Sequence, residues 1–150
     1  HYAAVRNQIE VGRALIERGI DVNAKSSRGN TALQFCAERN FPDFAKLLLE
    51  HGAAINEGDE AGWTPLHTAA AKNKPEMVKL LIDAGADLKK LSAAGGTALH
   101  EAAPGASAET IQILLDAGVD PKVKSTDGKT ALDIAKEFEN AEAVALLEKM

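Results

Sequence analysis

Apolar side chains recur along the chain at the three- and four-residue spacing of helices, in short runs separated by polar stretches that contain glycine. In the run 77–82 the apolar side chains would form a stripe too wide for contact on one side of a helix only. This predicts a helix packed on two sides. The run 66–70 is thinner and rich in alanine, which predicts a short helix whose neighbours approach closely. The stretch 53–63 alternates over short distances and indicates a hairpin.

This order of helix, turn, helix and hairpin repeats about every 33 residues. A glycine two places before a threonine keeps this spacing along the whole chain, at Gly29, Gly62, Gly95 and Gly128. The repetition predicts one all-α domain, a solenoid of stacked helix-turn-helix units linked by β-hairpins. Its units are a partial first repeat over 1–25, repeats over 26–58, 59–91 and 92–124, and a C-terminal capping repeat over 125–150.

Three other recurring positions have physical roles at the ends of the predicted helices. Threonines begin the first helix of a unit, because their side-chain oxygen accepts a free N–H group there. Acidic residues begin the second helix, where a negative charge meets the positive end of the helix dipole. A second set of glycines ends that helix in the left-handed conformation. These positions are Thr31, Thr64, Thr97 and Thr130; Glu10, Asp43, Glu76, Glu109 and Glu142; and Gly19, Gly52, Gly85 and Gly118.

The two ends of the chain depart from the pattern. Lys136 and Glu148 are polar at positions that would face a further repeat, so we expect the last unit to be a cap. The sequence begins in register with the middle of a first helix, so we expect residues before His1. Gly12 lies inside a predicted second helix, where a glycine costs about 1 kcal/mol relative to alanine. We therefore expect the first unit to be the least stable.

The segment 62–70, Gly-Trp-Thr-Pro-Leu-His-Thr-Ala-Ala, followed by Glu-Met-Val-Lys-Leu-Leu-Ile-Asp-Ala-Gly-Ala-Asp over 76–87, closely resembles the ankyrin repeat. The resemblance extends over the whole chain. It implies a curved stack with the first helices on the concave side and the hairpins projecting as a row of fingers, and it implies a non-catalytic binding module. The chain departs from the family pattern at Gln34, in place of histidine, and at alanines in place of proline. The alanines are Ala32, Ala98 and Ala131. We expect these changes to make their units less stable without changing the fold.

Composition narrows the classes of protein. The chain has 150 residues, of which 45% are hydrophobic and only 4% aromatic, which favours one helical domain. A formal net charge of -5 argues against nonspecific binding to nucleic acid or to an acidic membrane, and the apolar runs are too short to insert into a bilayer. The single cysteine, Cys36, excludes an intramolecular disulfide and a cysteine zinc site, and its position among alanines predicts a buried, inert thiol.

The residues give no sign of catalytic, metal or cofactor chemistry. His67 and His100 are one repeat apart, at a helix packing distance of about 8 to 10 Å, which is too far for both to ligate one zinc ion. We expect each of them to bond to backbone groups at its own repeat junction. The sequence Gly128-Lys129-Thr130 resembles the end of a phosphate-binding loop, but that motif needs glycine where the chain has Val123. We predict no enzyme, no metal and no cofactor.

Candidate binding residues lie where the units differ, at the finger tips and at the ends of the first helices. They are Lys25, Ser27, Arg28, Asn30, Glu38, Arg39, Glu60, Ala61, Trp63, Lys72, Leu91, Ala94, Pro104, Gly105, Lys124, Thr126, Asp127, Lys129 and Phe138. Trp63 either anchors a partner or packs on the next finger. Pro104 and Gly105 end a first helix early, as a tolerated loop or as a partner-specific shape. Lysines gathered on the last two fingers are either a solvated face or a means of orienting a partner.

The leading hypothesis is a protein–protein interaction module, monomeric when unbound, that binds a folded protein through its fingers and concave face. One alternative is an inhibitor or immunity protein that covers the active site of a partner enzyme. A second is a structural scaffold, part of a longer repeat protein. The sequence leaves the compartment open, with the cytoplasm as the default and the periplasm or secretion as alternatives.

Overall fold

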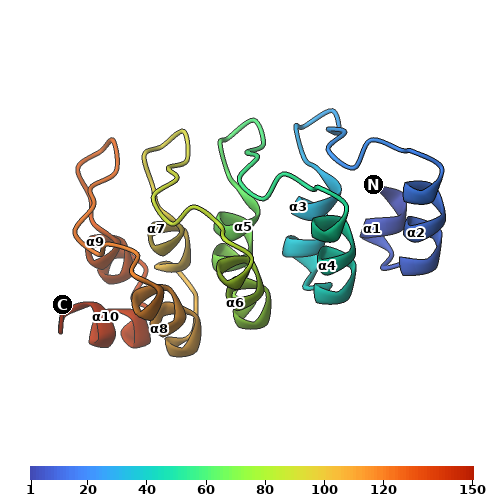
Figure 1. Cartoon of the computed structure of the whole chain (residues 1–150). Helices are drawn as coiled ribbons and strands as arrows, with labels where there is room; N and C mark the ends of the chain where they lie inside the picture. Colours follow the sequence, from blue (N-terminus) through green and yellow to red (C-terminus); the bar gives the residue numbers. More distant parts are fainter.

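The computed structural model describes residues 1–150 as ten α-helices without any β-strand, which confirms the predicted all-α repeat solenoid (Figure 1). The helices form two rows. The row of first helices consists of α1 (Tyr2–Val5), α3 (Ala32–Arg39), α5 (Pro65–Ala71), α7 (Ala98–Ala102) and α9 (Ala131–Glu137). The row of second helices consists of α2 (Ile9–Glu17), α4 (Pro42–Glu50), α6 (Pro75–Asp83), α8 (Ala108–Ala117) and α10 (Ala141–Leu147).

The predicted caps begin the first helices. The side chains of Thr31, Thr64 and Thr130 accept hydrogen bonds from the third residue of α3, α5 and α9. At the start of α7 the hydroxyl of Thr97 lies 3.0 Å from Nδ1 of His100 instead. The caps of α3, α5 and α9 each satisfy one of the N–H groups that a helix start leaves free.

The second helices begin and end as the sequence predicts. Each has its acidic residue in the first turn, and Pro42 and Pro75 occupy the start of α4 and α6. The four closing glycines have φ between 84° and 102°, which is the left-handed region. The turns inside the units use left-handed backbone too, at Asn7, Asn40, Asn73 and Glu139. Sequence analysis did not single out this second set, although asparagine tolerates positive φ better than most side chains.

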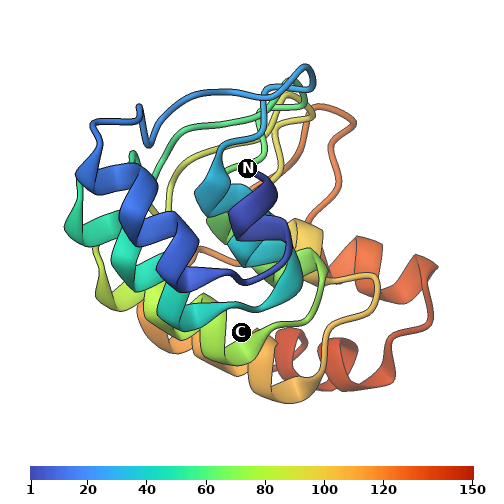
Figure 2. The ribbon, with the colours of Figure 1, turned by 90° about the vertical axis from the view of Figure 1, so that its right-hand side faces the viewer.

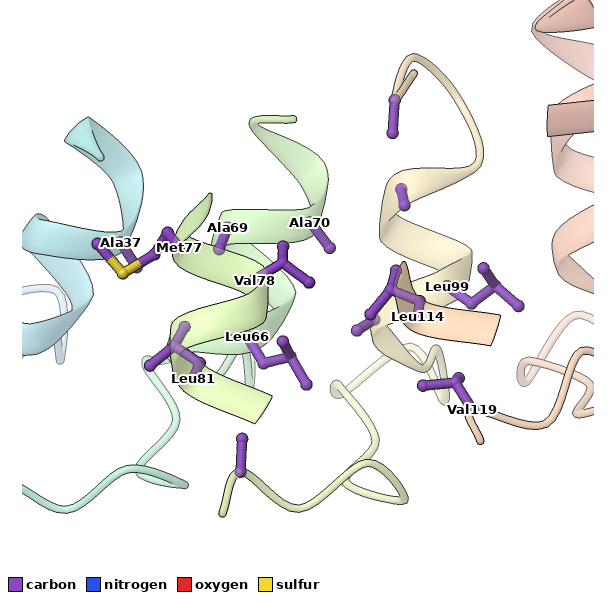
Figure 3. Close-up of a cluster of buried hydrophobic side chains, with 14 of the residues drawn as sticks. Ala37, Leu66, Ala69, Ala70, Met77, Val78, Leu81, Leu99, Leu114 and Val119 are labelled. Carbon is purple, nitrogen blue, oxygen red and sulfur yellow. The ribbon is translucent and has the colours of Figure 1, made fainter. Parts of the chain in front are cut away.

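The core runs through both rows and joins neighbouring units, as Figure 3 shows for Leu66, Met77, Leu81 and Leu99. Alanines fill it between the first helices, where small side chains let the helices approach closely. Cys36 belongs to this alanine layer and is fully buried, which confirms its predicted place. Burial raises the pKa of the Cys36 thiol to about 12, so the reactive thiolate does not form near neutral pH.

The mid-helix glycine of the first unit has a packing role. Gly12 is buried, and a Cβ at its position would collide with the ring tip of Phe44 on the next second helix. In the following junctions the residue in the Gly12 position grows while the residue in the Phe44 position shrinks. The successive pairs are Gly12 and Phe44, Ala45 and Met77, Val78 and Thr110, and Ile111 and Ala143. A larger side chain at one position is thus matched by a smaller one at the other, so that the pair has a similar combined volume at each junction.

The predicted β-hairpins are not confirmed, because none of the connecting loops contains a strand. Each loop ends instead in a five-residue turn closed by two backbone hydrogen bonds, such as Ser92 N–H to the carbonyl of Gly96 and Gly95 N–H to the carbonyl of Ser92, both at 2.9 Å. Figure 1 shows these loops as a row of projections on one side of the helices, and in Figure 2 their tips overhang the row of first helices. We keep the term finger for the four turns 26–30, 59–63, 92–96 and 125–129. No helix has the length and apolar character needed to cross a membrane.

Candidate functional site

The predicted binding residues lie together along one surface, made by the fingers and by the ends of the first helices that they overhang. None of them is buried. Four are half-buried, namely Asn30, Trp63, Pro104 and Lys129. The others are exposed, including Phe138 with 63% and Leu91 with 46% of their surface accessible. We call this the finger surface.

Side-chain oxygens at the first position of each finger hold the turn in shape. The Asp59 carboxylate accepts hydrogen bonds from the N–H groups of Ala61 and Trp63 at 2.9 and 3.0 Å. The Ser26 hydroxyl accepts from Asn30 N–H at 3.2 Å in the same way. These local bonds satisfy the turn without a β-ladder, which is why the fingers need no strands.

Backbone hydrogen bonds also connect each finger to the next. Glu60 N–H donates to the carbonyl of Arg28 at 3.4 Å, Ala93 N–H to Ala61 at 2.9 Å, and Thr126 N–H to Ala94 at 3.0 Å. Gly62 and Gly95 make this approach possible, because a Cβ at either position would come within about 3 Å of the next finger's backbone. The fingers therefore form one connected row.

Buried polar side chains tie the base of each of the last three fingers to the first helix of the preceding unit. Nε2 of His67 lies 3.1 Å from the carbonyl oxygen of Gly96, and Nε2 of His100 lies 3.1 Å from that of Lys129. Nδ1 of each ring accepts from the capping threonine N–H at 3.2 and 3.1 Å. Each neutral ring thus carries its proton on Nε2. The expected backbone role of these histidines is confirmed.

Gln34 takes the same place in the second unit and keeps most of this role. Its Nε2 donates to the carbonyl of Trp63 at 2.9 Å and to the hydroxyl of Thr68 at 2.9 Å. Its Oε1 is buried without a partner, and α3 lacks the return bond that a histidine ring gives to the capping threonine. The loss of stability expected at Gln34 therefore comes from the weaker helix cap, because the link between units is kept.

Ion pairs within the protein neutralise some of the charged side chains among the predicted binding residues. Lys25 pairs with Glu57 of the next loop, and Lys129 contacts Glu137 at 2.6 Å and Asp127 at 3.8 Å. The Lys25 side chain lowers the pKa of Glu57, and Glu137 raises the pKa of Lys129. Sequence analysis missed these pairs, although the spacing of Lys25 and Glu57 by about one repeat was a signal that could have found the first of them.

The shortened first helix of the fourth unit is supported from the third. Helix α7 ends at Ala102, before Pro104 and Gly105, as predicted. The loop is then held by Oδ1 of Asn73, which accepts from Ser107 N–H at 3.1 Å, from the Ser107 hydroxyl at 3.0 Å and from the Thr110 hydroxyl at 2.6 Å. The unusual loop is thus a fixed part of the surface. Sequence analysis did not find the roles of Asn73 and Thr110.

The structure does not decide between the two expectations for Trp63, because its side chain is half-buried. Its backbone is firmly held by Gln34 and Asp59. No group of three or more histidine, cysteine or acidic residues lies close enough together to hold a metal ion.

Comparison with known families agrees with the geometry. A family model described as "Ankyrin repeats (3 copies)" matches residues 1–92, and one described as "Ankyrin repeats (many copies)" matches residues 92–135. No curated protein matches the chain. The repeating caps, the stacked helix pairs and these matches together show that the chain belongs to the ankyrin repeat family.

Proposed function

We propose that this protein binds one folded protein partner through its finger surface and performs no chemistry on it. Ankyrin repeats in general act as protein–protein interaction modules. The observation that carries the proposal is the connected row of fingers, joined by backbone hydrogen bonds and fixed at its base by Gln34, His67 and His100. A surface ordered before binding loses little conformational entropy when the partner arrives.

The side chains on the finger surface suit such a contact. Trp63, Leu91 and Phe138 offer apolar area, and the polar positions between them, such as Asn30 and Thr126, offer hydrogen-bonding groups. Aromatic side chains often supply much of the energy of protein interfaces. Because Lys25 and Lys129 are paired within the protein, the cations of the finger surface left to attract a partner are Arg28, Arg39, Lys72 and Lys124.

Affinity capture from a lysate of the source organism, followed by mass spectrometry, tests the proposal. Wild-type protein is compared with a Trp63→Ala, Lys124→Glu variant of the finger surface and with a Lys79→Glu control on the exposed side of α6. Thermal unfolding of all three proteins shows first that they fold. The expected result is a partner retained by the control and lost by the finger variant. Capture that is equal in all three, or no partner at all, would contradict the proposal.

The nature of the captured partner decides between a simple binding module and an inhibitor. If the partner is an enzyme, its activity is measured with increasing amounts of wild-type protein and of the finger variant. Inhibition by the wild type alone supports a protein that covers the active site. Full activity in the saturated complex favours a binding module that leaves the active site free.

A further inference from the structure

One carboxylate on the finger surface is half-buried without a cation. Glu101 follows His100 on α7, and its Oε1 accepts a hydrogen bond from the Ser92 hydroxyl at 3.3 Å. A Cβ on Gly96 would lie 2.8 Å from the same oxygen, so the carboxylate sits against the base of the finger 92–96. No ion pair of the protein includes Glu101.

The surroundings of Glu101 make this carboxylate unusual in the molecule. Burial raises the pKa of Glu101, and the single bond from Ser92 only partly offsets that effect. A carboxylate can accept about four hydrogen bonds, and a strong bond from a hydroxyl group is about 2.5 to 2.7 Å long. The hydrogen-bonding capacity of Glu101 is therefore mostly unused.

The finger and first helix of the fourth unit carry this one charged group. Between Leu91 and Ala106, Glu101 is the only residue with a formal charge. On the neighbouring fingers, Asp59 accepts two backbone N–H groups and Asp127 lies beside Lys129, while Glu60 is exposed to solvent. A cation that approaches the fourth unit would thus meet one negative group and no competing positive one from residues 91–106.

The finger before this carboxylate carries an aromatic residue. In successive units the last finger position holds Asn30, Trp63, Gly96 and Lys129. Gly96 has no side chain, and the finger 59–63, which ends in Trp63, is joined to the finger 92–96 by the bond from Ala93 N–H to the carbonyl of Ala61 at 2.9 Å. An arginine side chain can place its planar guanidinium on a carboxylate and its flat face or its stem against an aromatic ring.

We propose that Glu101 is the docking point for an arginine side chain of the protein partner, at the base of the finger 92–96 and next to the finger that carries Trp63. The inference rests on the proposed function and specifies one contact of that interface. Arginine fits better than lysine because its two parallel N–H groups match the two oxygens of the carboxylate.

The test uses the capped tripeptide Gly-Arg-Gly as the probe and the same peptide with citrulline, which has the shape of arginine without its charge. Binding is followed by the fluorescence of Trp63, the only tryptophan, and by the NMR shift of the Glu101 side-chain carboxyl carbon. We expect saturable binding of the arginine peptide, and binding about tenfold weaker for citrulline and for the Glu101→Gln variant. Glu50→Gln, which changes an exposed carboxyl group on α4 outside the finger surface, should leave the affinity unchanged.

Equal binding by wild type and Glu101→Gln, an equal loss in Glu50→Gln, or no saturable response to the arginine peptide would overturn the inference. The peptide experiment needs no partner, so its failure is distinct from failure of the proposed function. Capture of a partner that ignores Glu101→Gln, with no response to the peptide, would remove the docking point and leave the binding module. Peptide binding at Glu101 without any captured partner would leave the docking point and remove the binding module.

Discussion

The two rows of helices hold the stack together by different means. Between the first helices, small side chains pack closely, and buried polar groups at Gln34, His67 and His100 reach the backbone of the next unit. Between the second helices, the contacts are mainly apolar and consist of pairs such as Gly12 with Phe44, whose sizes compensate each other. Hydrogen bonds are directional, whereas apolar packing depends on volume.

This difference explains why the finger surface is regular while the second row varies. A hydrogen bond of fixed geometry at each junction sets each finger at the same place relative to the unit before it. In the second row the paired side chains change from unit to unit while their combined size stays similar. The proposed binding surface is therefore built on the row with the stricter geometry.

The largest effect should follow from removing a polar link that has no substitute. Asn73→Ala would leave Ser107 N–H and the fully buried Thr110 hydroxyl without their acceptor. Asn40 is the matched control, because it has the same left-handed backbone but its Oδ1 has no partner. We expect Asn73→Ala to lower the free energy of unfolding by about 2 to 3 kcal/mol more than Asn40→Ala, measured by urea denaturation. Equal losses would show that the Asn73 bonds contribute nothing.

The next effect tests size compensation in the second row. Gly12→Ala would gain up to about 1 kcal/mol in an exposed helix, but here the new methyl group meets the Phe44 ring, and overpacking costs about 1 to 3 kcal/mol. We expect a net loss of about 1 kcal/mol, reversed when Phe44→Met is added. Gly105→Ala, at a site with open space, should not destabilise the protein. Additive effects of Gly12→Ala and Phe44→Met in a double-mutant cycle would show that the two side chains do not compensate each other.

The sequence predicted what the repeat dictates and missed what depends on contacts between particular side chains. The helix starts at Thr31 and Thr64 and the left-handed glycines follow from local rules, so they could be predicted. The sequence predicted only that Gly12 weakens its unit. It could not show that the ring of Phe44, 32 positions further along the chain, needs the space that a glycine leaves. The hairpins were predicted from alternation, but the loops form short turns in which backbone bonds are supplemented by a side-chain oxygen such as that of Asp59.

The sequence indicated which surface holds the candidate site, but not which of its charged side chains are paired or half-buried. All the predicted residues are accessible, because the repeat register shows which positions face outward. The pairing of Lys25 and Lys129 and the half-buried position of Glu101 depend on rotamers and on distances between units. One sequence without the fold does not determine these quantities.

A smaller effect of opposite sign should come from repairing the irregular first-row junction. Gln34→His would restore the return bond to the capping threonine and remove the unpaired Oε1, at the loss of the bond to Thr68. We expect a gain of about 0.5 to 1 kcal/mol in the free energy of unfolding. Chemical denaturation measures it. A loss of stability would mean that the bond from Gln34 to Thr68 outweighs the missing cap bond.

The smallest effect should be a pH dependence from the same row. Burial lowers the pKa of His67 from its usual 6.5, so between the two values the unfolded chain binds more protons than the folded one. The stability contributed by His67 is therefore fully present above pH 6.5 and decreases as the pH falls below it. His67→Gln should reduce this decrease, since Gln34 shows that glutamine keeps the link. Identical unfolding profiles of wild type and variant between about pH 7 and pH 5 would contradict the assignment.

Hydrogen exchange of the protein alone and with its captured partner tests the central claim most directly. If the finger surface binds the partner, exchange should slow at the fingers 26–30, 59–63, 92–96 and 125–129 and at the ends of α3, α5 and α7. The outer sides of α4, α6 and α8 should keep their rates. Slower exchange confined to the second helices, with the fingers unchanged, would contradict the account.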